Sequence, residues 1–255
     1  MNTSNPIGAL STIINNNVAT VSFAHPASNS FPRQLLNQLT TQINDLSTNP
    51  NVGVIILKSE GNGAFCAGAS FNELLAVKTP EEGTHFFSGF ANLINAMRVC
   101  TKIIVARIQG KAVGGGVGII AACDYAFALE SSAIKLSEIA IGIGPFVIEP
   151  AVSRKIGSTA MSQLALAPQH WKTAQWAHQK GLYTEVFENI EDLDQNLTVF
   201  ATNLATYNPE ALLEMKKIFW QNTNHWNELL IERAQISGKL VLSDFTKKAL
   251  EAFKK

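Results

Sequence analysis

Two glycine-rich segments are the first features of this chain that could do chemistry. Residues 61–68 follow a strand-like run at 52–57, and residues 109–118 follow a second such run at 103–108. Segments with so little side-chain bulk let backbone N–H groups approach a ligand, and a helix start adds the positive end of its dipole. Two such amides that converge would form an oxyanion hole for a developing enolate or tetrahedral oxygen. The alternative interpretation is a pair of tight turns that need only glycine conformations.

The second segment does not fit the common nucleotide-binding patterns. A phosphate-binding loop needs a glycine five residues before the Gly110-Lys111 pair, where Val105 stands. A dinucleotide fingerprint that starts at Gly114 needs Gly or Ala at position 119, which is Ile119. The spacing therefore disfavours an NAD- or ATP-binding protein.

A third feature is one acidic residue in an apolar stretch. Glu138 lies within residues 134–145, which are otherwise almost free of charge. A carboxyl group in apolar surroundings has a raised pKa and can serve as a base or acid near neutral pH. On its own, Glu138 could equally be a helix cap or a solvent-facing residue.

The elements that must position these residues alternate between strand and helix in the first two thirds of the chain. Hydrophobic spacing predicts strands at 18–23, 52–57, 103–108 and 125–129, with helices at 33–46, 81–99 and from 114. After residue 156 it predicts helices only, at 157–166, 173–180, 190–207, 209–222 and 226–253. We therefore expect an α/β core with a parallel sheet, followed by a helical C-terminal third. We interpret the aromatic stripe of Phe86, Phe87 and Phe90 as core packing.

Composition narrows the class of protein. The 255 residues are 46% hydrophobic and carry 20 basic and 20 acidic side chains, so no charge excess points to nucleic acid or an anionic membrane. The three cysteines, Cys66, Cys100 and Cys123, are widely spaced, which argues against a disulfide framework or a zinc site. We read no secretory signal and no run long enough to span a bilayer, and we expect a cytoplasmic protein.

Taken together and in this order, the three segments resemble the crotonase (enoyl-CoA hydratase/isomerase) family. The resemblance covers nearly the whole chain. It is carried by an early Phe-Ala-His-Pro at 23–26, by Cys-Ala-Gly-Ala at 66–69, by Gly-Gly-Gly at 114–116 with Cys-Asp-Tyr at 123–125, and by Ser-Asp-Phe at 243–245.

The resemblance implies a spiral of β-β-α units, the ClpP/crotonase fold. We assign this core to residues 1–195, and a helical C-terminal trimerisation region to residues 196–255. The resemblance to the family also implies self-association as a trimer or a dimer of trimers.

The ligand implied by the resemblance is an acyl-CoA thioester. CoA is then part of the substrate, so no separate cofactor and no metal is expected. Matched by motif, the amides of Ala69 and Gly115 would bind the thioester oxygen, and Glu138 would be the catalytic acid or base. The expected contacts to substrate or CoA are Cys66, Ala67, Gly68, Ser70 and Gly114 around the two loops, His25 near the CoA phosphates, and Lys247 and Lys248 on the last helix.

Departures from the family pattern bear on the reaction. Family hydratases carry two glutamates, and the first of the two positions is Gly118 here, whereas the second is Glu138. One carboxylate can move a proton between two carbons, so single-glutamate enoyl-CoA isomerase chemistry is slightly favoured. Ser70 also replaces the usual Asp after Cys-Ala-Gly-Ala, which leaves the orienting role of that carboxylate unfilled.

Two alternatives remain open at this point. Residues 144–150 resemble the corresponding stretch of some methylglutaconyl-CoA hydratases, and Glu149 within them is a possible second acid, or else a charge at a helix N-terminus. An enoyl-CoA or methylglutaconyl-CoA hydratase is therefore the first alternative. The second, of another class, is an acyl-CoA-binding homologue that has lost catalysis.

Overall fold

The main sheet of the computed structural model, which describes residues 7–252, has six strands in the order β1-β2-β3-β4-β6-β9. β1 and β2 pair antiparallel, and the other neighbours pair parallel. The strands are β1 (Ala9–Asn15), β2 (Val18–Ala24), β3 (Val54–Ser59), β4 (Ile103–Ile108), β6 (Tyr125–Leu129) and β9 (Glu185–Phe187). A second, three-stranded sheet of β5 (Ala112–Val113), β7 (Ala133–Lys135) and β8 (Lys172–Thr173) has the order β5-β7-β8.

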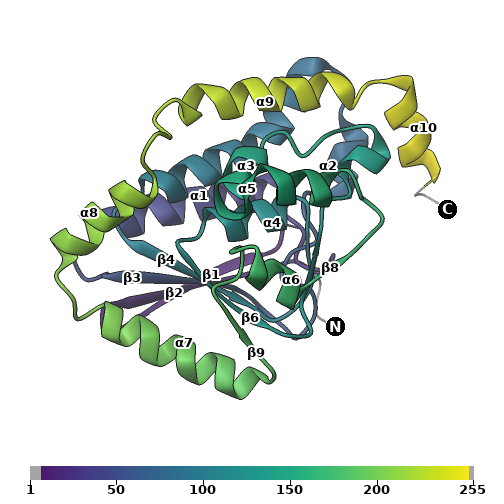
Figure 1. The fold of residues 1–255 in the computed structure, drawn as a ribbon. Helices are drawn as coiled ribbons and strands as arrows, with labels where there is room; N and C mark the ends of the chain where they lie inside the picture. Colours follow the sequence, from purple (N-terminus) through teal and green to yellow (C-terminus); the bar gives the residue numbers. More distant parts are fainter. Residues whose placement is uncertain (1–6, 253–255) are drawn as a thin grey trace, which may run out of the picture.

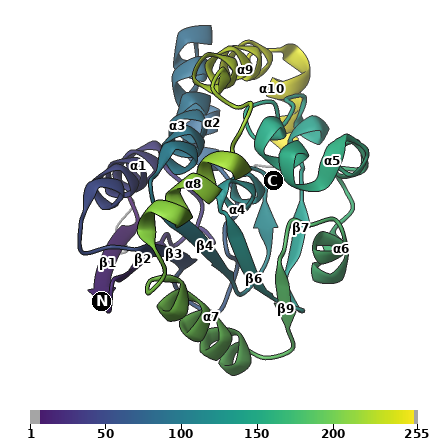
Figure 2. The same cartoon turned by 60° about the vertical axis from the view of Figure 1, so that its left-hand side comes forward.

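Helices cover both faces of the main sheet (Figure 1). The helices before the midpoint of the chain are α1 (Arg33–Thr48), α2 (Phe71–Ala76), α3 (Pro80–Val99) and α4 (Gly115–Ala122). The later ones are the 3-10 turn η1 (Glu138–Ile141), α5 (Glu149–Ala165), α6 (Ala174–Gln179), α7 (Ile190–Leu204), α8 (Pro209–Phe219), α9 (Trp226–Leu240) and α10 (Asp244–Ala252). Figures 1 and 2 both show α7 on one face of the sheet, with α1, α3 and α4 on the other.

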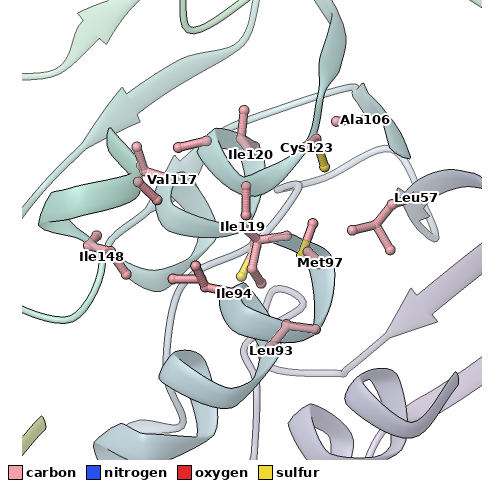
Figure 3. Close-up of a cluster of buried hydrophobic side chains, with 14 of the residues drawn as sticks. Leu57, Leu93, Ile94, Met97, Ala106, Val117, Ile119, Ile120, Cys123 and Ile148 are labelled. Carbon is pink, nitrogen blue, oxygen red and sulfur yellow. The ribbon is translucent and has the colours of Figure 1, made fainter. Parts of the chain in front are cut away.

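The strand alternation explains why the core has two parts. On β3, Ile55 and Leu57 face the large core under α1, α3 and α4, whereas Val54 and Ile56 face α7. Both sides of the strand are therefore buried, as its run of β-branched and aliphatic residues requires. Figure 3 shows the centre of the large core, where α3 and α4 meet through Leu93, Ile94, Met97, Val117, Ile119 and Ile120.

The predicted fold class is confirmed: an α/β core built from strand pairs and helices is followed by a helical segment. The small sheet supplies the second strand of the β-β-α units, with β5 after β4 and β7 after β6. The strand predictions at 18–23, 103–108 and 125–129 are confirmed almost residue for residue.

Some element predictions were wrong. Gly157, with φ 76° and ψ 160°, is not helical and divides α5 at a kink, so the helix predicted at 157–166 is its second half, and the first half, 149–156, was not predicted. The single helix expected at 226–253 is two helices, α9 and α10, with a break at 241–243. Strand β1 was not predicted. The boundary expected at residue 195 lies within α7, and the division of the chain into a core and an oligomerisation region stays a prediction.

Candidate active site

Two loops leave the carboxyl ends of neighbouring parallel strands, β3 and β4, and backbone hydrogen bonds join them. Val113 N–H donates to the Cys66 carbonyl at 2.9 Å, and Cys66 N–H donates to the Lys111 carbonyl at 3.3 Å. Because β3 and β4 pair directly, their following loops begin side by side. The sheet and these bonds together fix the 60–70 loop against the 109–114 loop.

The amide of Ala69 is left free by the pairing of its neighbours. Phe31 N–H donates to the Gly68 carbonyl at 2.8 Å, and Ser70 N–H donates to the Phe31 carbonyl at 2.9 Å. In an extended segment successive amides point to opposite sides, so the Ala69 N–H points away from Phe31. Within residues 7–252 it donates no hydrogen bond. Ala69 lines a cavity, and this N–H is available to a ligand.

The amide of Gly115 is free for a different reason, since Gly115 is the first residue of α4. The first N–H groups of a helix have no intrahelical acceptor, and this one donates no hydrogen bond within the described chain. A Cβ placed on Gly68 would lie 3.7 Å from Gly115 N, which shows how closely the loops approach. The two N–H groups predicted to form the oxyanion hole therefore border one cavity.

Phe90 explains why position 115 is a glycine. A Cβ at Gly115 would lie 2.2 to 2.8 Å from three atoms of the Phe90 ring. The sequence suggested that bulk at 115 would obstruct a ligand; the structure shows that it would first collide with the protein itself.

Glu138 lies beside the second loop. Its segment is held there because Gly114 N–H donates to the Lys135 carbonyl at 3.0 Å and β5 pairs with β7. The approach is so close that a Cβ on Gly114, whose φ is +53°, would be 2.8 Å from Glu138 Oε1. The carboxylate of Glu138 and the Gly115 amide thus stand at the same corner of the cavity.

The carboxyl end of Glu138 is buried without a full set of partners. Its Oε2 is inaccessible to solvent and accepts no hydrogen bond from any described residue. Burial raises the pKa of Glu138 to about 7, while the backbone N–H groups of Glu138 and Ser137 oppose the rise. At neutral pH the group therefore exists in both protonation states, which suits a residue that takes up and returns a proton.

The cavity between these groups encloses about 170 Å³ and is mainly apolar. Helix α3 contributes Phe86, Phe87 and Phe90, the segment before α5 contributes Phe146, and α9 contributes Ser237. Our interpretation of the α3 stripe as core was incomplete, because Phe86 and Phe90 are buried, Phe87 is partly buried, and all three also line the cavity. Their helical spacing was a visible signal, but core and cavity walls share the same apolar composition.

Position 118 has no room for a side chain. A Cβ there would lie 2.4 Å from Cγ2 and 2.7 Å from Cβ of Ile148, a cavity-lining residue. Figure 3 shows Ile148 beside α4. Where family hydratases carry their first glutamate, this chain therefore has a glycine covered by an isoleucine.

The predicted contact residues of the two loops divide into two groups. Ala67, Gly68 and Gly114 line the cavity. Ser70 instead caps α2, with Oγ accepting from Glu73 N–H at 3.4 Å. Cys66 is fully buried beneath the loop, where burial raises its pKa to about 12, so it stays a neutral thiol.

The remaining predicted residues lie outside the cavity lining. His25 stands in the turn after β2, where Nδ1 accepts from Ala27 N–H at 3.2 Å. Lys247 and Lys248 are exposed on α10, which packs over η1. Glu149 opens α5 and accepts a hydrogen bond from Ser153 Oγ at 2.6 Å.

Neither a metal centre nor a membrane span emerges from the described part of the chain. Residues 7–252 hold no group of three or more His, Cys, Asp or Glu placed to bind a metal. None of the helices in this range is long and apolar enough to cross a membrane.

The chain is similar to several known proteins in fold and sequence. A solved enoyl-CoA hydratase from Bacillus halodurans superposes with a TM-score of 0.86 over 95% of this chain and 99% of its own, at 22% identity. A peroxisomal Delta(3,5)-Delta(2,4)-dienoyl-CoA isomerase of Arabidopsis thaliana is 26% identical over 230 residues, covering 82% of this chain and 80% of that protein. A probable enoyl-CoA hydratase of Bacillus subtilis is 24% identical over 250 residues, which cover 97% of this chain and 96% of that protein.

The fold is the crotonase fold, as predicted. The family model for enoyl-CoA hydratase/isomerase matches residues 13–255. The chain belongs to this enzyme family, and an acyl-CoA substrate fits it.

Proposed function

We propose that this protein is an enoyl-CoA isomerase in which Glu138 moves one proton between two carbons of an acyl-CoA thioester. The amides of Ala69 and Gly115 bind the thioester oxygen and stabilise the enolate. Each oriented donor of this kind contributes about 3 kcal/mol to a transition state. The named activity of the Arabidopsis relative supports the same reaction type.

The step balances with a single carboxylate. Glu138 removes a proton from C2 of a 3-enoyl thioester, and the electron pair delocalises onto the thioester oxygen as a dienolate. The double bond then moves from C3–C4 to C2–C3, and the proton on Glu138 is delivered to C4. Glu138 lines the cavity, and its pKa of about 7 suits a group that takes up this proton and returns it.

The observation that carries the proposal is the contact between Gly118 and Ile148. Hydration needs one group to hold and deprotonate water and another to protonate the α-carbon. The side chain of Ile148 occupies the space of the first family glutamate, and Glu149 is bound to Ser153 outside the cavity lining. Only Glu138 brings a carboxyl group into the cavity from the described chain.

The test is incubation with 2-enoyl- and 3-enoyl-CoA esters in heavy water, with products analysed by mass spectrometry. The proposal expects a migrated double bond with no gain of oxygen, and deuterium enters the product only to the extent that Glu138 exchanges its proton with solvent between the two transfers. Addition of oxygen across the double bond would show a hydratase instead. Binding of the esters with no reaction of any kind would favour the non-catalytic homologue.

A further inference from the structure

Much of the cavity lining consists of groups that the proposed proton transfer does not use. Phe86 and Phe87 of α3, Phe146 and Ile141 surround it with rings and aliphatic carbons. Apart from Glu138, the polar side chains that line it are the hydroxyls of Ser137 and Ser237. Across residues 7–252, no lysine, arginine or histidine reaches the lining.

Helix α9 also contributes to the cavity lining, and its packing on α3 holds it in place. Ser237 belongs to α9, is 1% exposed and lines the cavity. Next to it, α9 touches α3 through glycines: a Cβ on Gly83 would lie 2.7 Å from Gly238 Cα. Because backbone meets backbone there, the wall cannot retreat by a change of side-chain rotamer.

This lining discriminates strongly between acyl groups by charge. A carboxylate at the far end of an acyl chain would lose water and find no cation, which is costly for a buried anion. It would also share the cavity with Glu138, and two carboxylates in one site repel. An apolar chain of the same length gains about fourfold in affinity for each buried methylene.

We infer that the acyl group accepted by this cavity is uncharged and apolar, and that thioesters bearing a second, free carboxylate are rejected. This inference rests on the acyl-thioester function proposed above. It names the class of substrate and excludes dicarboxylic acyl groups such as methylglutaconyl.

The test compares three saturated thioesters of equal acyl length, which bind without turnover. Hexanoyl-CoA, adipoyl-CoA and the monomethyl ester of adipoyl-CoA are titrated into the wild-type protein at pH 7.5 by calorimetry. We expect hexanoyl-CoA and the methyl ester to bind at least about 100-fold more tightly than adipoyl-CoA, because only the free acid carries the extra charge. Equal affinities for the acid and its methyl ester would overturn the inference.

A variant of the cavity lining tests whether the acyl group binds in this cavity. Ser237→Leu fills the wall, so we expect hexanoyl-CoA to bind at least tenfold more weakly while acetyl-CoA binds within threefold of wild type. Ile236→Leu, which changes the exposed neighbouring residue of α9, is the matched control. Unaltered hexanoyl-CoA binding by folded Ser237→Leu would contradict the placement. The wild-type comparison stands alone if this variant does not fold.

The two proposals can fail separately. Selective binding of hexanoyl-CoA without isomerisation of any enoyl-CoA refutes the isomerase and leaves the inferred substrate class standing. Isomerisation together with equal binding of adipoyl-CoA refutes only the substrate class. Absence of binding by all three esters refutes both.

Discussion

At the scale of single residues, Glu138 combines a near-neutral pKa with an oxygen that lacks a partner within the described chain. An ordinary buried carboxyl is satisfied by several donors, which hold it ionised and lower its pKa. Here the local donors only oppose the effect of burial in part. The residue is therefore less stable in its ionised form than it would be in water, and this favours uptake of a proton.

Replacing Glu138 with Gln should remove turnover while binding survives. The amide keeps the size of the side chain but cannot accept and return a proton, so we expect kcat to fall at least about 1,000-fold. Affinity for a saturated acyl-CoA should stay within a few-fold of wild type. Steady-state kinetics and calorimetry measure the two quantities.

Glu149→Gln is the control for this prediction. Glu149 bonds to Ser153 and lies outside the cavity lining, so its replacement should change kcat less than about threefold. A large loss with Glu149→Gln, or normal turnover with Glu138→Gln, would contradict the assignment of the proton carrier.

The raised pKa of Glu138 also predicts a pH-dependent stability. The folded state binds this proton more tightly than the unfolded chain, whose pKa is near 4.5. The stabilisation is therefore fully present below about pH 4.5 and is lost as the pH rises through about 7. We expect the free energy of unfolding of wild type, relative to Glu138→Gln, to fall by about 2 to 3 kcal/mol between pH 4.5 and 8. Urea unfolding across this range measures it, and a constant difference would contradict the pKa.

The sequence was sufficient to propose Glu138 and the two glycine loops but not the cavity around them. An acid in an apolar run and glycines after buried strands are local patterns, and they are visible in one dimension. Ser237 lies about a hundred residues from Glu138, and a lone serine on a helix carries no signal. Its contribution arises only because α9 packs on α3.

At the scale of elements, the contact between α4 and the start of α5 decides what position 118 can hold. Gly118→Ala should be destabilising by about 1 to 3 kcal/mol, because its Cβ would overlap Cγ2 and Cβ of Ile148. Adding Ile148→Ala should recover part of this loss, so the two substitutions are not additive. Urea unfolding of both single variants and the double variant measures the coupling.

Gly63→Ala is the matched control for that prediction. A Cβ at Gly63 meets nothing within 4 Å, so the substitution should be neutral or slightly stabilising. Equal effects at Gly63 and Gly118 would show that backbone freedom, rather than Ile148, governs position 118.

Elements with strong periodicity were predictable, and those defined by tertiary contacts were not. Runs of β-branched residues indicate the buried strands predicted at 52–57 and 103–108, and a short apolar run indicates the one at 125–129. β1, with the pattern ALSTIIN, is largely exposed and gains its structure from pairing with β2. The two-residue strands β5 and β8 are too short to leave any pattern and exist only through the small sheet.

At the scale of the whole molecule, one buried aspartate joins the C-terminal helices to the α/β core. Asp124 accepts hydrogen bonds from Ile104 N–H of β4 at 2.8 Å and from Trp220 Nε1 at 2.9 Å. Lys216 of α8 lies 2.9 Å from the same carboxylate, and Lys155 of α5 donates to the Asp124 carbonyl at 3.1 Å. One charge cluster therefore joins β4, α5 and α8 to the turn between α4 and β6.

Sequence reasoning missed this cluster because lysine is among the residues least often buried. Lys216 and Lys217 look alike on the polar face of a helix. Only the packing of α8 against β4 separates them, since the side chain of Lys216 is 2% exposed and that of Lys217 is 61% exposed. The family resemblance predicted the fold as a whole, but it did not indicate which contacts hold the C-terminal helices against the α/β core.

Lys216→Met should therefore be strongly destabilising, whereas Lys217→Met should not. Losing Lys216 leaves the Asp124 carboxylate and the Lys102 carbonyl buried with one partner fewer, at a cost of about 3 kcal/mol. Lys217 pairs only with exposed Glu214, and such a pair contributes less than about 1 kcal/mol. Urea unfolding of the two variants, one residue apart on α8, measures the difference. Equal losses would mean that the helix, and not the buried ion pair, holds the C-terminal third to the core.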